Sequence, residues 1–282
     1  MPIRLLSFEQ HDSILRIELL ERNANPATQD DESKIQDLVA KEASYAILSH
    51  TWLRSAPGEI TYNDWINGNL GSNTPGYHKL VNFCRAAWTN HKLSLGWIDT
   101  ICINKDSSSE LDESIRCMYN WYQRASVCII HLAQTNLLSE IHLDPWFTRG
   151  WTLQELLAPP FVKFYNKDWR KFVQNLDNNK PSRYNFAFNS ELLQITEQIA
   201  TATTLTPDEL KDIRTVSLSR RMQLAANRKV TREEDTAYSL MGIFDISMTT
   251  AYGEGSIRAF SRLLQKIINS TSTGILDLVW GR

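Results

Sequence analysis

The feature that most constrains the fold of this chain is the alternation of continuously apolar runs with amphipathic segments. The apolar runs are YAIL (Tyr45 to Leu48), SLGWIDTICI, ASVCIIHLA and FVKFYN, which lie between residues 45 and 166. Segments with helical spacing separate them, for example residues 77–91. Strands that are apolar throughout are buried on both faces, as in parallel sheets that helices cover. The sequence therefore predicts an α/β protein with a parallel sheet flanked by helices.

The N-terminal part carries weaker patterns that we interpret in the same way. Residues 13–20 alternate apolar and polar side chains, which together with RLLSF before them predicts a β-hairpin. Residues 21–43 are polar and acidic, and they predict a loop. A helix is expected over residues 107–125, with Ser107 and Glu110 forming a capping box at its start.

The C-terminal part is helical in pattern from about residue 190. Thr206 and Pro207 predict a helix start, because a threonine cap followed by proline suits the first helical turn. Further helices are expected over residues 217–228, 232–244 and 257–268. We therefore predict one domain over residues 1–282. It has an α/β core at 1–170 and a mainly helical extension at 171–282, packed on that core.

The composition excludes several classes of protein. The 282 residues are 42% hydrophobic and 22% charged with a net charge of −2, so no basic surface for nucleic acid or an anionic membrane is indicated. The four cysteines form no C-x-x-C pair, which argues against a zinc site or a disulfide framework. The chain has no signal-peptide pattern and no apolar run long enough to span a membrane. We expect a cytoplasmic protein without a bound metal or prosthetic group.

Polar and aromatic residues follow three of the predicted strands, at the edge where parallel sheets bind ligands. These candidate site residues are Ser49, His50, Trp52, Asp99, Arg149, Trp151 and Glu155. In the stretch RGWTLQELLAPP, a short helix that ends at Pro159 holds Glu155 between apolar neighbours, so its carboxylate is expected to be at least half buried. A half-buried carboxylate in a cleft is a candidate for chemistry.

Each of these residues also has a purely structural interpretation. His50 could be a core histidine, and Asp99 could cap the following loop or pair with Arg149. The tryptophans could serve packing alone. The charges between Arg228 and Asp235 suit a structural ion network at a helix start, and the glycines around Glu254 suit a loop that docks onto the α/β part better than a phosphate cradle.

The order of motifs resembles the HET (heterokaryon incompatibility) family. The motifs are YAILSHTW, GYHKL, WIDTICINK, SIRCMYNWYQRASVCIIHLA, WFTRGWTLQELLAP, RMQLAANRKVTREEDTAYSLMGIF and AYGEGSIRAFSRLLQ, and they cover nearly the whole chain. The resemblance implies a fungal domain that triggers cell death after non-self recognition. It also implies self-association and a possible partnership with a nucleotide-binding receptor. After SHTW the family usually has glycine and acidic residues, whereas this chain has Leu53, Arg54 and Ser55.

HET domains in turn resemble TIR domains, whose fold is flavodoxin-like. In enzymatic TIR proteins a glutamate on a short helix after the third strand supports NAD nucleosidase activity, and Glu155 with Trp151 matches that placement. The resemblance therefore implies NAD+ as substrate and Glu155 as catalytic residue. The resemblance supports site roles for Ser49 and His50 less strongly than for Glu155 and Trp151.

The sequence is compatible with two other functions. The domain could signal without catalysis, as an adaptor that assembles and recruits partners. Alternatively, Cys102 could act as the nucleophile of a thiol hydrolase with His50 and Asp99, although Cys102 lies in an apolar run without an evident activating neighbour.

Overall fold

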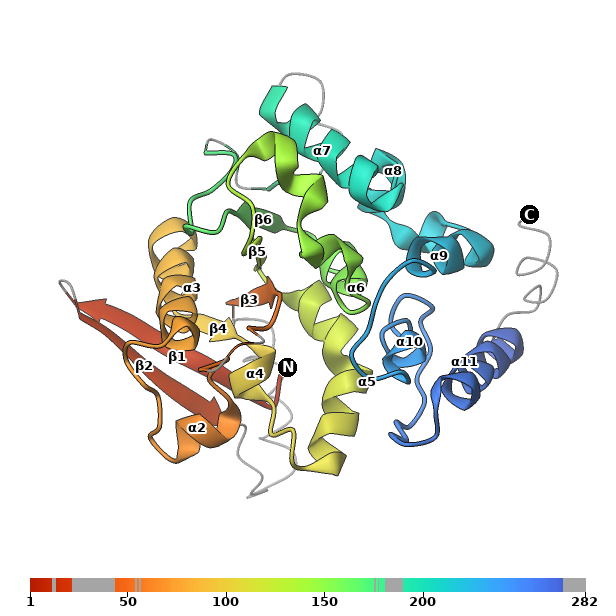
Figure 1. Cartoon of the computed structure of the whole chain (residues 1–282), viewed down its shortest axis with the longest axis horizontal. Coiled ribbons are helices and arrows are strands. Elements are labelled where there is room, and N and C mark those ends of the chain that lie inside the picture. The colour runs from red at the N-terminus through yellow and green to blue at the C-terminus, as the bar shows by residue number, and fades with distance from the viewer. Residues whose placement is uncertain are drawn as a thin grey trace, which may run out of the picture. The chain divides into compact units, whose positions relative to one another are not determined.

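A computed structural model describes residues 1–11, 14–21, 44–53, 55, 57–174, 176, 178–180 and 190–270. The loop predicted over residues 21–43 lies almost wholly outside these residues, as does Arg54 of the unusual Leu53–Ser55 stretch. Figure 1 shows the elements and their labels. The described parts divide into two compact units. Unit 1 comprises Met1–Leu48, Trp52–Ser114 and Ala125–Ile129, and unit 2 comprises Ser49–Thr51, Ile115–Arg124 and Ile130–Arg282.

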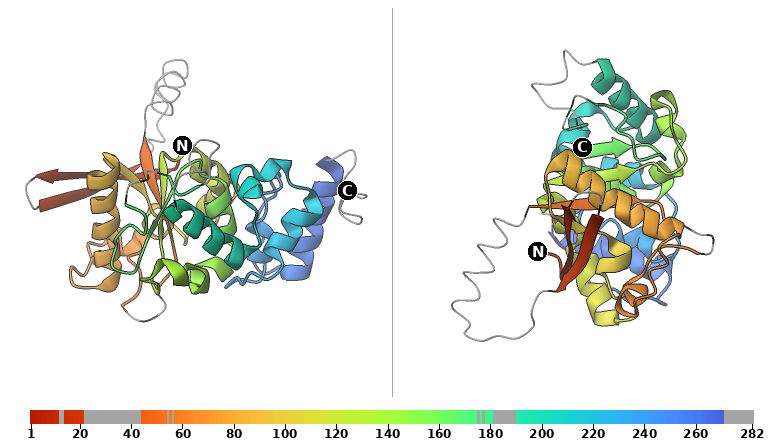
Figure 2. Two further views of the ribbon diagram at one scale, coloured as in Figure 1. Left: turned by 90° about the horizontal axis from the view of Figure 1, so that it is seen from above. Right: turned by 90° about the vertical axis from the view of Figure 1, so that its left-hand side faces the viewer.

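A six-stranded mixed sheet confirms the predicted α/β class, with strand order β2-β1-β4-β3-β5-β6. The strands are β1 (Arg4–His11), β2 (Ile14–Glu21), β3 (Tyr45–His50), β4 (Leu95–Trp97), β5 (Val127–His131) and β6 (Val162–Tyr165). β3 and β4 are parallel, as expected for apolar strands, and every residue of β3, β5 and β6 is buried. The predicted N-terminal hairpin is confirmed, because β1 pairs antiparallel with β2 from Arg4↔Glu21 to His11↔Ile14 (Figure 2).

The helices lie where they were expected if the sequence offers both a capping residue and apolar residues at helical spacing. They are α2 (Tyr62–Ile66), α3 (Pro75–His91), α4 (Asp99–Cys102), α5 (Ser108–Arg124), α6 (Thr152–Leu157), α7 (Ser190–Thr203), α8 (Pro207–Lys211), α9 (Leu218–Ala225), α10 (Asp235–Tyr238) and α11 (Ser256–Ser270). Three short 3-10 turns complete the described elements: η1 (Leu138–Leu143), η2 (Pro145–Thr148) and η3 (Ile213–Thr215). At α8, the cap by Thr206 and the position of Pro207 are confirmed, and Glu209 completes a capping box.

Two predicted elements are shorter than expected. The run SLGWIDTICI is a strand only over Leu95–Trp97, because Asp99 begins the helical turn α4. The stretch 232–244 is helical only over Asp235–Tyr238. In both cases the apolar pattern reports burial correctly, but burial does not distinguish a strand from turns that are equally buried.

The capping box predicted for α5 forms only in part. Ser107 Oγ accepts a hydrogen bond from the Glu110 backbone N–H at 3.4 Å. The Glu110 carboxylate bonds instead to the backbone N–H of Asn104 at 2.6 Å and forms an ion pair with the Arg4 guanidinium. Glu110 therefore ties the first strand of unit 1 to the loop before α5.

Candidate functional site

In unit 2, the carboxylate of Glu155 is held at the end of β3. Glu155 is 8% exposed and Ser49 is fully buried. The Ser49 hydroxyl donates a hydrogen bond to Glu155 Oε2, and the indole Nε1 of Trp146 donates to Ser49 Oγ at 2.8 Å. Because an indole N–H can only donate, the Ser49 proton is left for the carboxylate. Trp146, Ser49 and Glu155 therefore form a directed chain of donors that ends on the carboxylate.

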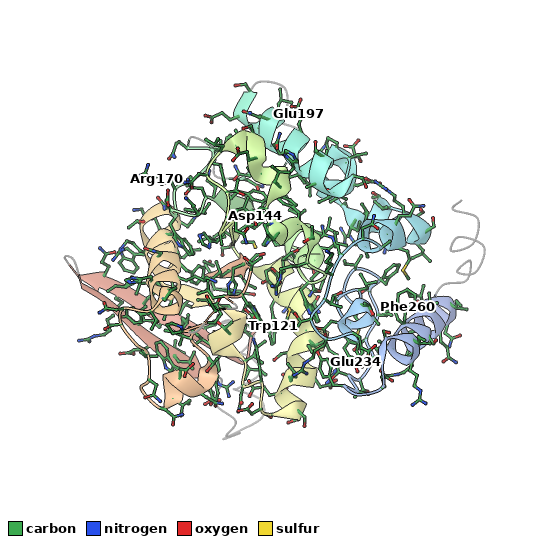
Figure 3. The ribbon with its side chains drawn as sticks, in the orientation of Figure 1. Trp121, Asp144, Arg170, Glu197, Glu234 and Phe260 are labelled. Atoms are coloured by element: carbon green, nitrogen blue, oxygen red, sulfur yellow. The ribbon has the colours of Figure 1, made fainter. Side chains whose placement is uncertain are left out.

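The local sequence explains why α6 presents Glu155 in this way. Asp144 caps the turn η2 by accepting the backbone N–H of Trp146 at 3.0 Å, with Pro145 in the first position of that turn. Figure 3 labels Asp144 within this part of the chain. Thr152 Oγ1 then donates to the Trp146 carbonyl at 2.6 Å, which joins η2 to the start of α6. Because the turns are joined, Trp146 and Glu155 keep a fixed relation to each other.

Two cations from later in the chain hold the ends of α6. At its start, Arg228 Nη1 donates to the Arg149 carbonyl at 2.9 Å and to Thr152 Oγ1 at 3.1 Å. At its end, Lys180 Nζ donates to the carbonyls of Leu157 at 2.8 Å and Pro159 at 2.6 Å. The last carbonyls of a helix have no intrahelical donor, and Pro159 has no backbone N–H to offer them. The buried ammonium of Lys180 supplies the hydrogen bonds instead.

Arg228 also contributes charge beside Glu155. Burial lowers the pKa of the Arg228 guanidinium to about 10, while the negative charge of Glu155 acts in the opposite direction. The guanidinium therefore stays protonated at neutral pH. Its buried Nη2 has no hydrogen-bond partner within the described part of the chain. Buried donors usually have acceptors, so this N–H is available to a ligand or to an ordered water.

Trp151, the candidate four residues before Glu155, directs its indole N–H to another carboxylate. Its indole Nε1 donates to Asp235 Oδ2 at 3.1 Å, and the Tyr252 hydroxyl donates to Asp235 Oδ1 at 2.8 Å. Burial raises the pKa of Asp235, and these two hydrogen bonds oppose that rise. The neighbouring Glu234 accepts the backbone N–H groups of Gly253 at 2.7 Å and Gly255 at 3.2 Å. The glycine loop thus docks on the start of α10.

The remaining candidates have separate surroundings. In unit 2, His50 is buried and the Arg149 side chain is half-buried. Trp52 and Asp99 belong to unit 1, where Lys105 contacts both. Its ammonium lies 3.8 Å from the centroid of the Trp52 ring and 3.2 Å from Asp99 Oδ2. Asp99 therefore forms an ion pair with Lys105. Trp52 is 42% exposed and offers an aromatic surface.

The geometry disfavours a cysteine nucleophile. Cys102 is 2% exposed, and burial raises the pKa of its thiol to about 12. The thiolate that a hydrolase needs is therefore scarce at neutral pH. Within the described ranges, no group of three or more His, Cys, Asp or Glu side chains is arranged to hold a metal ion. None of the described helices combines the length and apolar character that crossing a membrane requires.

Sequence reasoning missed Trp146 and Arg228 as members of this site. Trp146 is nine residues before Glu155, and its indole is linked to the carboxylate through Ser49. Arg228 was assigned to an ion network at the start of α10, because it is near Glu233, Glu234 and Asp235 in sequence. No local pattern indicated that it would turn toward α6.

Comparison with known proteins gives consistent results. Residues 45–142 match the family model described as heterokaryon incompatibility protein (HET). The chain is 37% identical over 235 residues to the vegetative incompatibility protein HET-E-1 of Podospora anserina. That alignment covers 79% of this chain but 16% of the relative, so the chain corresponds to a small part of the longer protein. No solved structure matches the chain significantly.

Proposed function

Because the chain belongs to the heterokaryon incompatibility (HET) family, we propose that it serves fungal heterokaryon incompatibility by cleaving the nicotinamide–ribose bond of NAD+. Glu155 is the proposed catalytic residue. The family match supports the role in incompatibility. The observation that carries the proposed chemistry is the buried Glu155 carboxylate, oriented by Ser49 and placed near the charge of Arg228.

The proposed reaction needs one oriented negative charge. The bond between the ribose carbon and the nicotinamide nitrogen breaks, and both electrons leave with nicotinamide, which departs neutral. Positive charge therefore develops on the ribose, as in glycoside cleavage, and no general acid is required. Water then adds to the ribose carbon and releases a proton, which gives ADP-ribose.

In this proposal Glu155 stabilises the charged ribose. A carboxylate that is already oriented costs little reorganisation when the charge forms, and a partly dehydrated site strengthens the attraction. The donor chain from Trp146 through Ser49 fixes the direction of the oxygens. Arg228 would supply its unused Nη2 donor to an oxygen of the bound dinucleotide, since a guanidinium suits phosphate and hydroxyl oxygens.

The direct test is NAD+ turnover by purified protein with Glu155→Gln. Glutamine keeps the side-chain size and an oxygen that can accept the Ser49 hydrogen bond, so the fold should persist. We expect kcat/KM to fall by about 100-fold or more, the usual effect of removing one electrostatic stabiliser. Glu197→Gln is the matched control, because Glu197 is exposed on α7 (Figure 3).

Folding of both variants is checked by circular dichroism and by thermal unfolding. If folded Glu155→Gln cleaves NAD+ at the wild-type rate, Glu155 has no role in the reaction. If the wild-type protein shows no turnover while cell death still occurs on expression, the enzymatic proposal is wrong.

Assembly without catalysis is the second candidate function. Large apolar side chains are exposed in unit 2, where Leu143 is 69% and Ile257 is 82% exposed. Exposed apolar groups can serve contacts between proteins, although single ones are common. Cell death that survives Glu155→Ala but is lost with Leu143→Lys or Ile257→Lys would favour this function. Loss of death with Glu155→Ala and retention with the surface variants would favour catalysis.

A further inference from the structure

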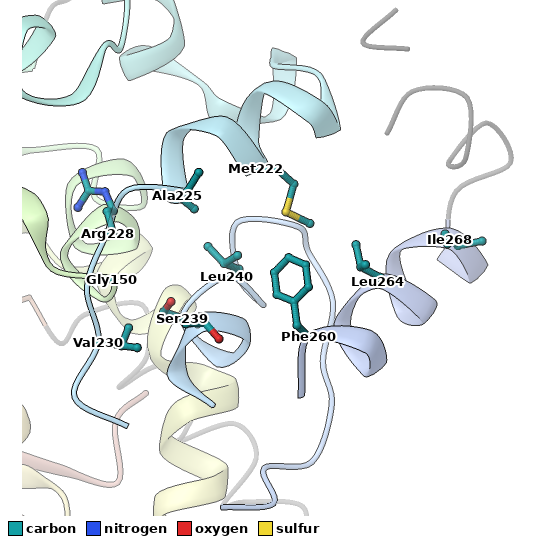
Figure 4. A pocket seen from close by; sticks show the side chains of 12 residues that line it. Gly150, Met222, Ala225, Arg228, Val230, Ser239, Leu240, Phe260, Leu264 and Ile268 are labelled. Carbon is teal, nitrogen blue, oxygen red and sulfur yellow. The ribbon is translucent and has the colours of Figure 1, made fainter. Parts of the chain in front are cut away.

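Unit 2 contains a cavity of about 650 Å³ whose lining shares only Arg228 with the residues of the proposed reaction. Its walls come from α9 and the segment after it, from α10 and the segment after it, and from α11, together with Gly150 before α6. Figure 4 shows the side chains that line it. Its volume lies within the range of about 300–1,000 Å³ that is usual for small-molecule sites.

The cavity has an apolar part and a more polar end. Met222, Phe260 and Leu264 line the apolar part, and the last two are half-buried side chains of α11. Gly150, Arg228 and Ser239 lie at the other end in Figure 4. A ligand that matches this cavity therefore has an apolar body and one polar group.

Ser239 supplies a specific polar contact at that end. The residue is 2% exposed, and its Oγ lies beside Gly150, 3.5 Å from where a Cβ on that glycine would be. No hydrogen bond of the Ser239 hydroxyl is found within the described part of the chain. A hydroxyl in a nearly buried residue that lines a cavity is a ready partner for a ligand atom.

The charge at this end sets the preferred head group. The Arg228 guanidinium points away from the cavity in Figure 4 and bonds to the start of α6. Its positive charge nevertheless lies at the polar end, where water is partly excluded, and it favours a negative group. The hydroxyl of Ser239 can donate to the same group.

We propose that this cavity is a second binding site, for a single-chain amphiphile with an aliphatic body and a terminal carboxylate. The aliphatic chain lies against Met222, Phe260 and Leu264. The carboxylate accepts a hydrogen bond from Ser239 and is attracted by the charge of Arg228. A chain of about ten carbons fits within a cavity of this volume. The proposal does not depend on NAD+ cleavage, since binding is measured without turnover.

Decanoate, used below its micelle concentration, is the probe, and isothermal titration calorimetry measures its binding. We expect saturable binding at one site per chain in the wild-type protein. Leu264→Trp fills the cavity and should weaken binding at least tenfold. Ile257→Trp is the matched control, because it adds the same ring to α11 at a residue that is 82% exposed. It should bind as the wild type does.

Two further arms keep the test decisive. Ser239→Ala should weaken decanoate binding by about three- to tenfold, the usual effect of one lost hydrogen bond. 1-Decanol, which has the same chain without charge, should bind less tightly than decanoate. If Leu264→Trp fails to fold, Ala225→Phe on α9 fills the cavity from the opposite wall.

The proposal is overturned if the wild-type protein shows no saturable binding, or if a folded cavity-filling variant binds decanoate as tightly as the Ile257→Trp control. Equal or tighter binding of 1-decanol would overturn the assignment of an anionic head group.

Discussion

Two buried carboxylates in unit 2 are both linked to tryptophan, yet their surroundings differ. Glu155 receives a hydrogen bond from Ser49, which itself accepts from Trp146. Asp235 accepts directly from Trp151 and from Tyr252. The two side chains are about equally exposed, at 8% and 7%. Burial alone therefore does not identify the functional group.

The partners of each carboxylate distinguish their roles. Asp235 joins three parts of the chain, because Trp151 precedes α6 and Tyr252 lies in the loop before α11. That arrangement is typical of a structural tie. Glu155 instead lies near a guanidinium whose Nη2 donor is not used by the described residues. A buried carboxylate close to an available donor fits the catalytic role that we propose for Glu155.

The largest expected effect on stability comes from Asp235→Ala. The substitution leaves the Trp151 N–H and the Tyr252 hydroxyl without this acceptor, and unsatisfied donors are costly. We expect the free energy of unfolding to fall by about 2–3 kcal/mol. Urea unfolding followed by circular dichroism measures it, with Asp208→Ala as the control because that side chain is 91% exposed. Equal stability of the two variants would contradict the structural role of Asp235.

A smaller effect on stability is expected for Ser49→Ala. The variant removes the acceptor of the fully buried Trp146 indole and the donor to Glu155, so unfolding should cost about 1–2 kcal/mol less. Because Glu155 loses its orientation, NAD+ turnover should fall by about tenfold, less than for Glu155→Gln. Ser261→Ala, at an exposed position of α11, is the control. A Ser49→Ala variant with unchanged turnover would show that the donor chain is purely structural.

The smallest effect is a difference in how stability depends on pH. Burial raises the pKa of Asp235 above 3.8, so folding favours its protonated form, and ionisation as the pH rises through that raised pKa costs stability. The hydrogen bond from Arg220 lowers the pKa of Glu209 below 4.5, so its contribution is present above 4.5 and is lost as the pH falls through the lowered pKa. The two groups therefore act with opposite sign.

Two neutral variants separate these contributions. From about pH 3 to about pH 6, the stability of Asp235→Asn relative to wild type should rise, and that of Glu209→Gln should fall. Urea unfolding at several pH values measures both differences. If the relative stability of both variants changed with the same sign, the distinction would be wrong. Burial would then not disfavour the ionised form of Asp235 while the ion pair with Arg220 stabilises that of Glu209.

Much of the fold could be predicted from the sequence, because burial leaves a local pattern. The run YAIL lies in β3, which continues two residues further to His50, and RGWTLQELLAPP contains a short helix that ends before its prolines, as expected. Burial of Glu155 followed from its apolar neighbours. Predictions of length were less successful: the stretch from Asp235 to Phe244 is mostly buried turns, whose apolar pattern is indistinguishable from that of a helix.

The partners of the site residues could not be predicted in the same way. Trp151 bonds to Asp235, which is 84 residues later, and Ser49 bonds to Glu155, which is 106 residues later. Spacing within a helix indicates which side chains share a face, but it carries no information about such distant contacts. The hydrogen bonds of Trp151 to Asp235 and of Ser49 to Glu155 therefore lie outside what local spacing can predict.

The clamping of α6 by Arg228 and Lys180 limits how far this chain can be shortened. A six-residue helix has almost no stability by itself in water. The first 170 residues include every strand of the sheet and the acid itself, but they include neither cation. A fragment trimmed to those residues would keep the strands, but α6 would lose its contacts with Arg228 and Lys180 and would fray. Lack of activity in such a fragment would therefore not show that Glu155 is inactive in the whole chain.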